Sequence, residues 1–264
     1  KISAGPGSER RRAHAPGAAV RVAPLSAFRH FCQAGVTIRS EDSGVALHTL
    51  GTRVTLYSFF RSSAAYRTRI ALNLKGIAYT IAPIHLSKDG GQHKTAGYRA
   101  LNPQMRVPSL ALPSGEVLTQ SMAIIEYLEE TQPNPPLLPG DPVARAQVRA
   151  LADIIACDIH PLNNTSSLNY LRSKLGQAEA EIAAWYAHWI TLGFEAIETL
   201  IKPGPYAFGA RPSLADVVLV PQVYNARRFN VPLDRFPRIV AVDAECLELP
   251  AFDRARPENQ PDAE

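Results

Sequence analysis

The order of predicted elements in the first part of the chain constrains the fold most. Residues 56–60 are mostly strand formers, and residues 67–74 then place apolar side chains at helical spacing before Gly76. Residues 77–86 predict a second strand, which makes a strand–helix–strand unit. A short helix, a hairpin of two strands and a longer helix complete the order βαβαββα, at residues 93–101, 109–113, 116–118 and 121–131.

A proline-rich segment follows this unit. Residues 131–142 carry five prolines and one glycine, a composition typical of a linker. We therefore assign 53–131 as one domain, 132–141 as the linker and 142–264 as a second domain. Apolar spacing in the second domain predicts only helices, including segments at 178–201 and 237–248, a helix that begins at Ser213 with Asp216 in a capping box, and a kink at Pro161. The predicted fold class is α/β followed by all-α.

Composition excludes several classes of protein. The chain of 264 residues is 46% apolar, but it contains no run of eighteen apolar residues that would predict a membrane span. Its net charge of +4 comes from residues 1–40, which carry seven basic residues and one acid; the rest is mildly acidic, so nucleic-acid binding is not indicated. The three cysteines lie far apart, which argues against a metal site or disulfide framework and favours a reducing, cytoplasmic location. Residues 1–52 are Ala-, Arg- and Ser-rich, as in a disordered extension or an organelle-targeting segment.

Arg61, Ser62 and Ser63 stand between the first predicted strand and its helix. A serine at this place is most often an N-cap, and that interpretation stays open. A helix N-terminus also carries unpaired N–H groups and a partial positive charge, so a hydroxyl there can donate to a bound anion such as a thiolate and lower the pKa of the thiol.

Two further features accompany the serines. Val107-Pro108 precedes a predicted strand, where a cis-proline can expose the valine backbone to an extended peptide. Gln120-Ser121 begins the next helix, which provides a second place for an anion, suited to a carboxylate.

The residues that carry a family resemblance span about 54–262. They are the stretches LYSFFRSS, RIALNLKG, LNPQMRVPSL, QSMAIIEYLEE, CDIHPLNN, PSLADVVLVPQVYNARRF and the closing QPD. On these motifs the chain resembles the zeta class of the cytosolic glutathione transferases, which includes the maleylacetoacetate isomerases and the bacterial glutathione-dependent maleylpyruvate isomerases. The resemblance implies a thioredoxin-like domain followed by an all-helical domain, and a homodimer.

The resemblance also implies site residues. Ser62 and Ser63 would hold the sulfur of glutathione, while Arg61 and Arg228 would bind the carboxylates of a small dianionic maleyl substrate, because guanidinium groups suit planar carboxylates. Arg227 is expected to be a surface charge. Further glutathione-binding positions implied by the resemblance are Arg67, His93, Val107, Pro108, Gln120, Ser121, His160, Asn164, Thr165 and Ser166.

The implied reaction is glutathione-dependent cis–trans isomerisation of maleylacetoacetate to fumarylacetoacetate in tyrosine and phenylalanine breakdown, by reversible thiolate addition. The alternatives are maleylpyruvate isomerisation in gentisate degradation, general glutathione transfer, and a non-catalytic glutathione-binding module. Ala64 stands where the zeta motif usually has cysteine, which excludes a mechanism that needs that cysteine. Thr165-Ser166 stands where maleylpyruvate isomerases can carry arginines, which favours maleylacetoacetate.

Overall fold

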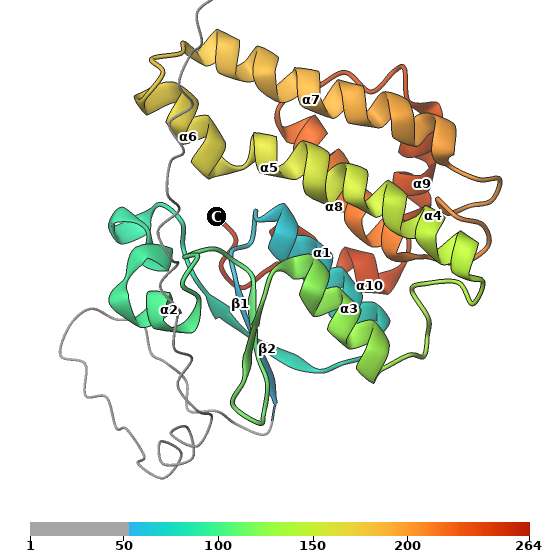
Figure 1. Cartoon of the computed structure of the whole chain (residues 1–264), viewed down its shortest axis with the longest axis horizontal. Helices are drawn as coiled ribbons and strands as arrows, with labels where there is room; N and C mark the ends of the chain where they lie inside the picture. Colours follow the sequence, from blue (N-terminus) through green and yellow to red (C-terminus); the bar gives the residue numbers. More distant parts are fainter. Residues whose placement is uncertain (1–52) are drawn as a thin grey trace, which may run out of the picture. The chain divides into compact units, whose positions relative to one another are not determined.

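The computed structural model describes residues 53–264 (Figure 1). The predicted extension at 1–52 lies outside the described residues. Within them, strands and helices alternate first, and the chain is entirely helical after α3 (Ser121–Thr131). The predicted fold class is therefore confirmed.

Four strands form one mixed sheet in the order β2-β1-β3-β4. The central strand β1 (Val54–Ser58) runs parallel to β2 (Tyr79–Pro83) and antiparallel to β3 (Ser109–Ala111), and β3 pairs with β4 (Val117–Thr119) as the predicted hairpin. The second strand is shorter than predicted. Its last hydrogen bond to β1 runs from the N–H of Ile84 to the C=O of Ser58, at 2.7 Å, and the N–H of His85 then donates to the side chain of Gln92, at 2.8 Å.

The helix predicted at 93–101 is in fact two pieces, a 3₁₀ turn at Gln92–Lys94 and α2 (Ala96–Leu101). Thr95 separates them because it is extended, with ψ 151°, and its hydroxyl accepts the N–H of Tyr98 as the N-cap of α2. The helical periodicity of residues 93–101 predicted one helix, but the extended backbone and capping hydroxyl of Thr95 divide it into two.

Helix α1 (Ser63–Leu74) is buried along most of its length because it packs against α3 on one side and α8 (Leu214–Arg228) on the other. One large apolar core extends from β1, α1 and α3 into the helices of the second half. A smaller cluster around Tyr57, Phe60 and Tyr98 covers the opposite face of the sheet.

The helical half consists of α4 (Pro142–Asp153), a π-helical turn at Ile154–Ile159, α5 (His160–Asn163), α6 (Thr165–Ser173), α7 (Glu179–Leu200), α8, α9 (Pro237–Leu247) and α10 (Pro250–Asp253). The kink expected at Pro161 takes the form of the π turn, in which the N–H of His160 reaches back to the C=O of Ile155. The capping box at α8 is confirmed: buried Asp216 accepts from the N–H and hydroxyl of Ser213.

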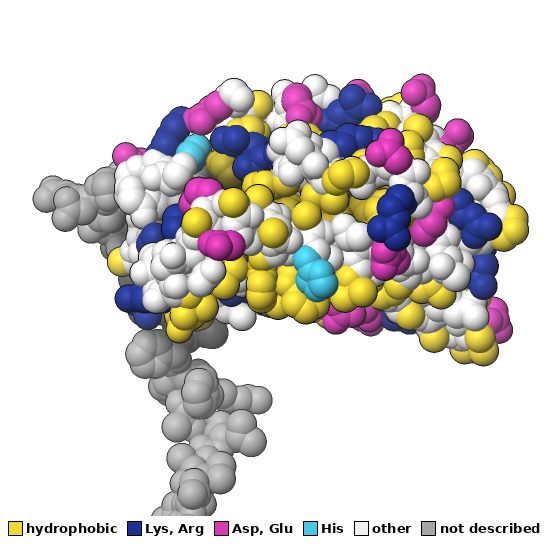
Figure 2. Space-filling view, turned by 90° about the horizontal axis from the view of Figure 1, so that it is seen from above, with side chains coloured by type: hydrophobic (Ala, Val, Ile, Leu, Met, Phe, Trp, Pro, Cys, Tyr) yellow, Lys and Arg dark blue, Asp and Glu magenta, His cyan; other side chains and the backbone are white. Residues whose placement is uncertain are grey.

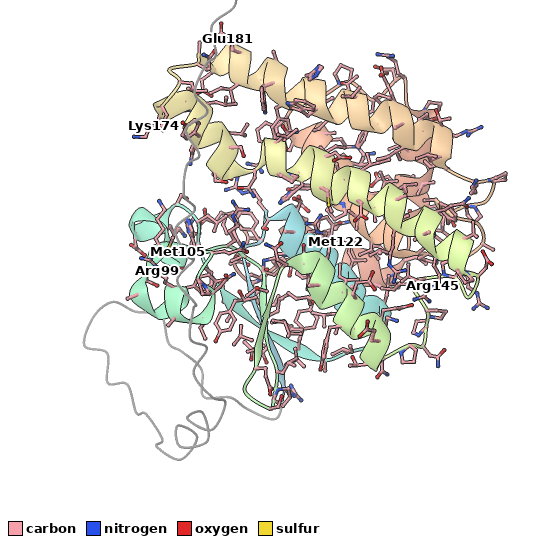
Figure 3. All side chains as sticks on the ribbon, in the orientation of Figure 1. Arg99, Met105, Met122, Arg145, Lys174 and Glu181 are labelled. Atoms are coloured by element: carbon pink, nitrogen blue, oxygen red, sulfur yellow. The ribbon has the colours of Figure 1, made fainter. Side chains whose placement is uncertain are left out.

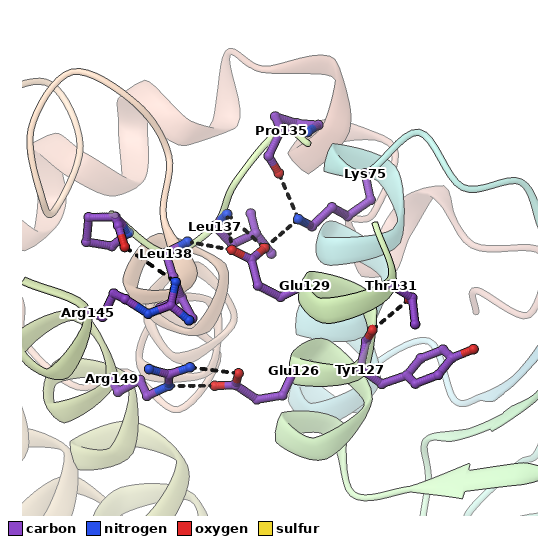
Figure 4. A network of polar contacts seen from close by, with 11 residues as sticks. Lys75, Glu126, Tyr127, Glu129, Thr131, Pro135, Leu137, Leu138, Arg145 and Arg149 are labelled. Carbon is purple, nitrogen blue, oxygen red and sulfur yellow. Dashed lines mark hydrogen bonds and ion pairs between the residues drawn. The ribbon is translucent and has the colours of Figure 1, made fainter. Parts of the chain in front are cut away.

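A buried ion pair of the N-terminal domain holds the segment that leads to the helical half (Figure 4). Lys75 pairs with Glu129 on α3 and also donates to the C=O of Pro135, at 2.8 Å. Glu129 in turn accepts the N–H groups of Leu137 and Leu138 at 3.0–3.1 Å. The segment between α3 and α4 is thus fixed by hydrogen bonds to its own backbone, and not only by its prolines.

Acidic and basic side chains are interspersed with apolar ones on the face seen in Figure 2, so neither sign of charge dominates that face. Among residues 53–264, no helix has both the length and the apolar character that crossing a membrane requires.

Candidate active site

A cavity of about 530 Å³ lies where the two halves of the structure meet. Its wall is formed by the loop at the N-terminus of α1, the loop that precedes β3, and residues of α5, α6 and α8. Met105, which Figure 3 places beside α2, belongs to this wall.

The loop before α1 is held from both sides. The N–H of Phe60 donates to the carboxylate of Asp262, at 3.0 Å, and the C=O of Phe60 accepts from the buried guanidinium of Arg69, also at 3.0 Å. Because both backbone groups are fixed, the loop presents residues 61–63 to the cavity in one geometry.

The two serines have different partners. Ser62 is the N-cap of α1, and its Oγ accepts the N–H of Ala65 at 3.2 Å, so the N-cap interpretation is confirmed for this residue. Ser63 is buried, and its Oγ lies 3.1 Å from Nδ1 of His160. Both serines line the cavity.

His160 is neutral at physiological pH. Desolvation lowers the pKa of His160 to about 3, and the positive charges of Arg67 and Arg106 act in the same direction. Its other ring nitrogen, Nε2, lies 3.5 Å from the amide nitrogen of Asn164.

Among residues 53–264, four cationic side chains and no aspartate or glutamate line the cavity; the four are Arg61, Lys94, Arg106 and Arg228. The guanidinium of Arg61 lies over the ring of Phe60, 4.6 Å from its centroid, and that of Arg228 lies 4.9 Å from the centroid of Phe229. A cavity whose charged side chains are all positive attracts anions.

Several polar groups in the wall lack a hydrogen-bond partner among the described residues. They are the buried atoms Nε of Arg61, Nδ1 of His93, Oδ1 of Asn163 and Nε2 of Gln222. The backbone N–H and C=O of Val107 are likewise unpaired in this part of the chain, and the Val107–Pro108 bond is cis. Buried polar groups are normally satisfied, so a wall with this many unpaired groups fits a polar, peptide-like ligand such as glutathione.

The structure brings most of the predicted site residues together. The cavity is lined by Arg61, Ser62, Ser63, His93, Val107, His160, Asn164, Thr165, Ser166 and Arg228. Arg67, Pro108, Gln120 and Ser121 are not among its lining residues, so their glutathione-binding roles stay predictions. Arg67 is buried and donates to the hydroxyl of Ser121 at 2.8 Å, and Gln120 has a left-handed backbone, with φ 66°.

Sequence reasoning missed several residues of the wall. Gln222 and Asn225 stand six and three positions before Arg228 on α8, a helical spacing that could have identified them. The sequence around Arg106 did not indicate a place in the cavity. Its Nη2 lies 3.5 Å from Oγ of Ser166, sixty positions away, and a contact over that separation is not visible in the sequence. Arg227 is exposed, as predicted for a surface charge, and its guanidinium also pairs with the buried carboxylate of Asp243.

The comparisons with known proteins agree with this site. Residues 61–131 match the glutathione S-transferase N-terminal domain, and residues 179–242 match the C-terminal domain of the same family. Maleylacetoacetate isomerase of Pseudomonas aeruginosa is 52% identical over 207 residues, which cover 78% of this chain and 97% of that protein. The chain belongs to the glutathione S-transferase family.

Solved structures place it more finely. The holo structure of a maleylpyruvate isomerase, described as a bacterial glutathione S-transferase of the zeta class, is 52% identical with a TM-score of 0.77, and covers 80% of this chain and all of that one. Maleylacetoacetate isomerase of Anaeromyxobacter dehalogenans, solved with glutathione bound in its active site, is 40% identical with a TM-score of 0.72, covering 80% of this chain and 98% of that one. The zeta class is therefore its place within the family, as the motifs predicted.

Proposed function

We propose that the protein is a glutathione-dependent cis–trans isomerase that converts maleylacetoacetate to fumarylacetoacetate. The observation that carries the proposal is the cavity wall, whose described residues include the serines at the N-terminus of α1 and four cations but no carboxylate. Such a wall suits a thiolate together with a small dianionic substrate. It does not suit a neutral aromatic electrophile equally well, which weakens the case for a general transferase.

Glutathione, when bound, supplies the thiolate that adds reversibly to the conjugated double bond, about which the substrate can then rotate. The hydroxyls of Ser62 and Ser63 and the N–H groups of the first turn of α1 favour the ionised sulfur. Ala64 lines the cavity where the zeta motif usually has cysteine, so the chain contributes no thiol of its own there.

Arg61 and Arg228 bind the carboxylates of the substrate and stabilise the negative charge that develops on its carbonyl oxygen. Neither guanidinium forms an ion pair among the described residues, so both are available to a ligand. Tyr186 and Phe229 are stacked with ring centroids 4.0 Å apart and give the cavity an apolar wall.

Maleylpyruvate is the second candidate substrate, and one contact favours it. The absence of arginine at 165–166 favoured maleylacetoacetate, but Arg106 places a guanidinium beside Ser166, at 3.5 Å. A cation is therefore present at that place after all, supplied by a different element. A homodimer and a cytoplasmic location stay predictions.

The experiment compares turnover of maleylacetoacetate and maleylpyruvate by the purified protein, with and without glutathione, followed by ultraviolet absorbance. We expect turnover only with glutathione, and the ratio of the two rates identifies the substrate. Arg228→Met should lower kcat/KM by about ten- to a hundredfold, since a hydrogen bond to a charged group contributes about 1.5–3 kcal/mol. Arg235→Met is the matched control, because Arg235 pairs with Glu195 on an exposed surface.

Glutathione binding without turnover of either compound would contradict the isomerase and favour a transferase or a binding module. An equal loss in the Arg228 and Arg235 variants would contradict the role of Arg228.

A further inference from the structure

The orientation of the Asn164 side chain is fixed by α6. Asn164 is the N-cap of that helix, and its Oδ1 accepts both the N–H of Ser166, at 3.0 Å, and the hydroxyl of Ser166, at 2.9 Å. A backbone N–H can only donate, so the atom that faces it must be the amide oxygen. The amide nitrogen of Asn164, a donor without acceptor capacity, is therefore the atom that faces Nε2 of His160 at 3.5 Å.

This donor decides the tautomer of His160. Because the amide nitrogen cannot accept, Nε2 of the imidazole must be the acceptor in this contact. In a neutral imidazole the other nitrogen, Nδ1, then carries the hydrogen. Burial keeps the pKa of His160 at about 3, and Arg67 and Arg106 oppose a second proton on the ring, so the neutral form applies throughout the physiological range.

The tautomer in turn sets the direction of the bond to Ser63. With its hydrogen on Nδ1, His160 donates to Oγ of Ser63 across 3.1 Å. The hydroxyl of Ser63 then does not need to donate to His160, and its own hydrogen can be directed into the cavity that Ser63 lines. In the opposite tautomer, with the hydrogen on Nε2, the hydroxyl of Ser63 would donate to Nδ1. Only the lone pairs of Oγ would then face the cavity, where they would repel an anion.

We infer that Asn164 and His160 are positioning residues, which form a chain of hydrogen bonds that directs the hydroxyl of Ser63 as a donor toward the thiolate in the cavity. This inference rests on the proposed function for the identity of the anion. No proton passes along the chain: the thiol proton leaves to water, and the three side chains keep the hydrogens they start with. Ser62 stands outside this chain of hydrogen bonds, because its Oγ accepts the backbone N–H of Ala65.

The first test reads the tautomer without any ligand. Nitrogen-15 NMR of the histidine ring in the free protein should show His160 with its hydrogen on Nδ1. In Asn164→Asp the carboxylate still caps α6 but can only accept, so the hydrogen of the neutral ring should move to Nε2, which then donates to the new carboxylate. A wild-type His160 with its hydrogen on Nε2 would overturn the inference, whatever the protein does with glutathione.

The second test measures the thiol pKa of bound glutathione, by the ultraviolet absorbance of the thiolate in the binary complex. Loss of one hydrogen bond to a charged form raises such a pKa by about one unit, so Asn164→Asp should hold about tenfold less thiolate at neutral pH. Thr165→Asp adds the same charge to the cavity wall beside Asn164 but leaves the chain of hydrogen bonds intact, so it measures the part of the rise that comes from charge repulsion alone. His160→Leu should raise the thiol pKa as well. His160→Gln should raise it less, because a glutamine amide can still donate to Ser63.

The outcomes separate the two proposals. Glutathione that binds Asn164→Asp with an unchanged thiol pKa would overturn the inference while the isomerase proposal stands. Failure of the wild-type protein to bind glutathione would overturn the proposed function, and with it the thiolate as the acceptor of Ser63, although the tautomer measurement would still report on the first two hydrogen bonds.

Discussion

The cations of the core and the cations of the cavity differ in what they bind. Arg69 is completely buried and donates to three acceptors, the C=O groups of Ala255 and Phe60 and the hydroxyl of Ser58. Arg61, only eight positions away, has a buried Nε with no partner among the described residues. The fold itself compensates the desolvated charge of Arg69, whereas Arg61 keeps a donor that a ligand can use.

The largest expected effect is on stability, at a core cation. Lys75→Met leaves the carboxylate of Glu129 buried opposite an apolar side chain, and breaking a buried pair in this way costs about 3–5 kcal/mol. Chemical denaturation measures the free energy of unfolding. The control is Arg149→Met, which breaks the half-exposed pair with Glu126 and should cost less than about 1 kcal/mol. Equal losses in the two variants would mean that burial does not distinguish the pairs.

The next effect concerns His160, a wall residue that is kept neutral. Its folded pKa of about 3 lies below the unfolded value of about 6.5, so the unfolded chain binds the extra proton between these values, and stability falls as the pH is lowered through this window. We expect His160 to contribute about 2–3 kcal/mol to the loss of stability between pH 7 and pH 4. Denaturation curves at both pH values should therefore show a smaller loss for His160→Gln than for the wild type. The same loss in both would mean that His160 takes up its proton in the folded state.

The smallest effect is on turnover, at an exposed cation of the cavity. Arg106→Gln removes a charge that is partly screened by solvent, so kcat/KM should fall only about three- to fivefold, and less at high salt. Arg99→Gln removes the same charge from α2, outside the cavity wall (Figure 3), and should change kcat/KM little. A similar loss of kcat/KM in both variants would indicate that Arg106 attracts the substrate only through the net charge of the protein and does not contact it.

Motifs and periodicity predicted the parts of the molecule that depend on local sequence. The strand–helix–strand unit, the hairpin and the capping box at Asp216 all follow from neighbouring residues, and the resemblance located Ser62, Ser63 and Arg228 in advance. Thr95 shows the limit of periodicity, since one capping hydroxyl divided a predicted helix.

The rest could not be predicted because it depends on contacts between distant residues. Arg106 meets Ser166, and Arg227 meets Asp243, only once the helices are packed. The roles of the two serines are another example. Adjacent and identical in sequence, they differ because only Ser63 lies against His160, ninety-seven positions further along the chain.

The bond between Phe60 and Asp262 has a consequence for how the protein matures. Its two residues are 202 positions apart, so a nascent chain that has synthesised the serine loop still lacks the carboxylate that fixes it. During synthesis the loop before α1 therefore first lacks one of the two partners that hold Phe60. The hydrogen bond to Asp262 can form only once the chain has been synthesised up to that residue.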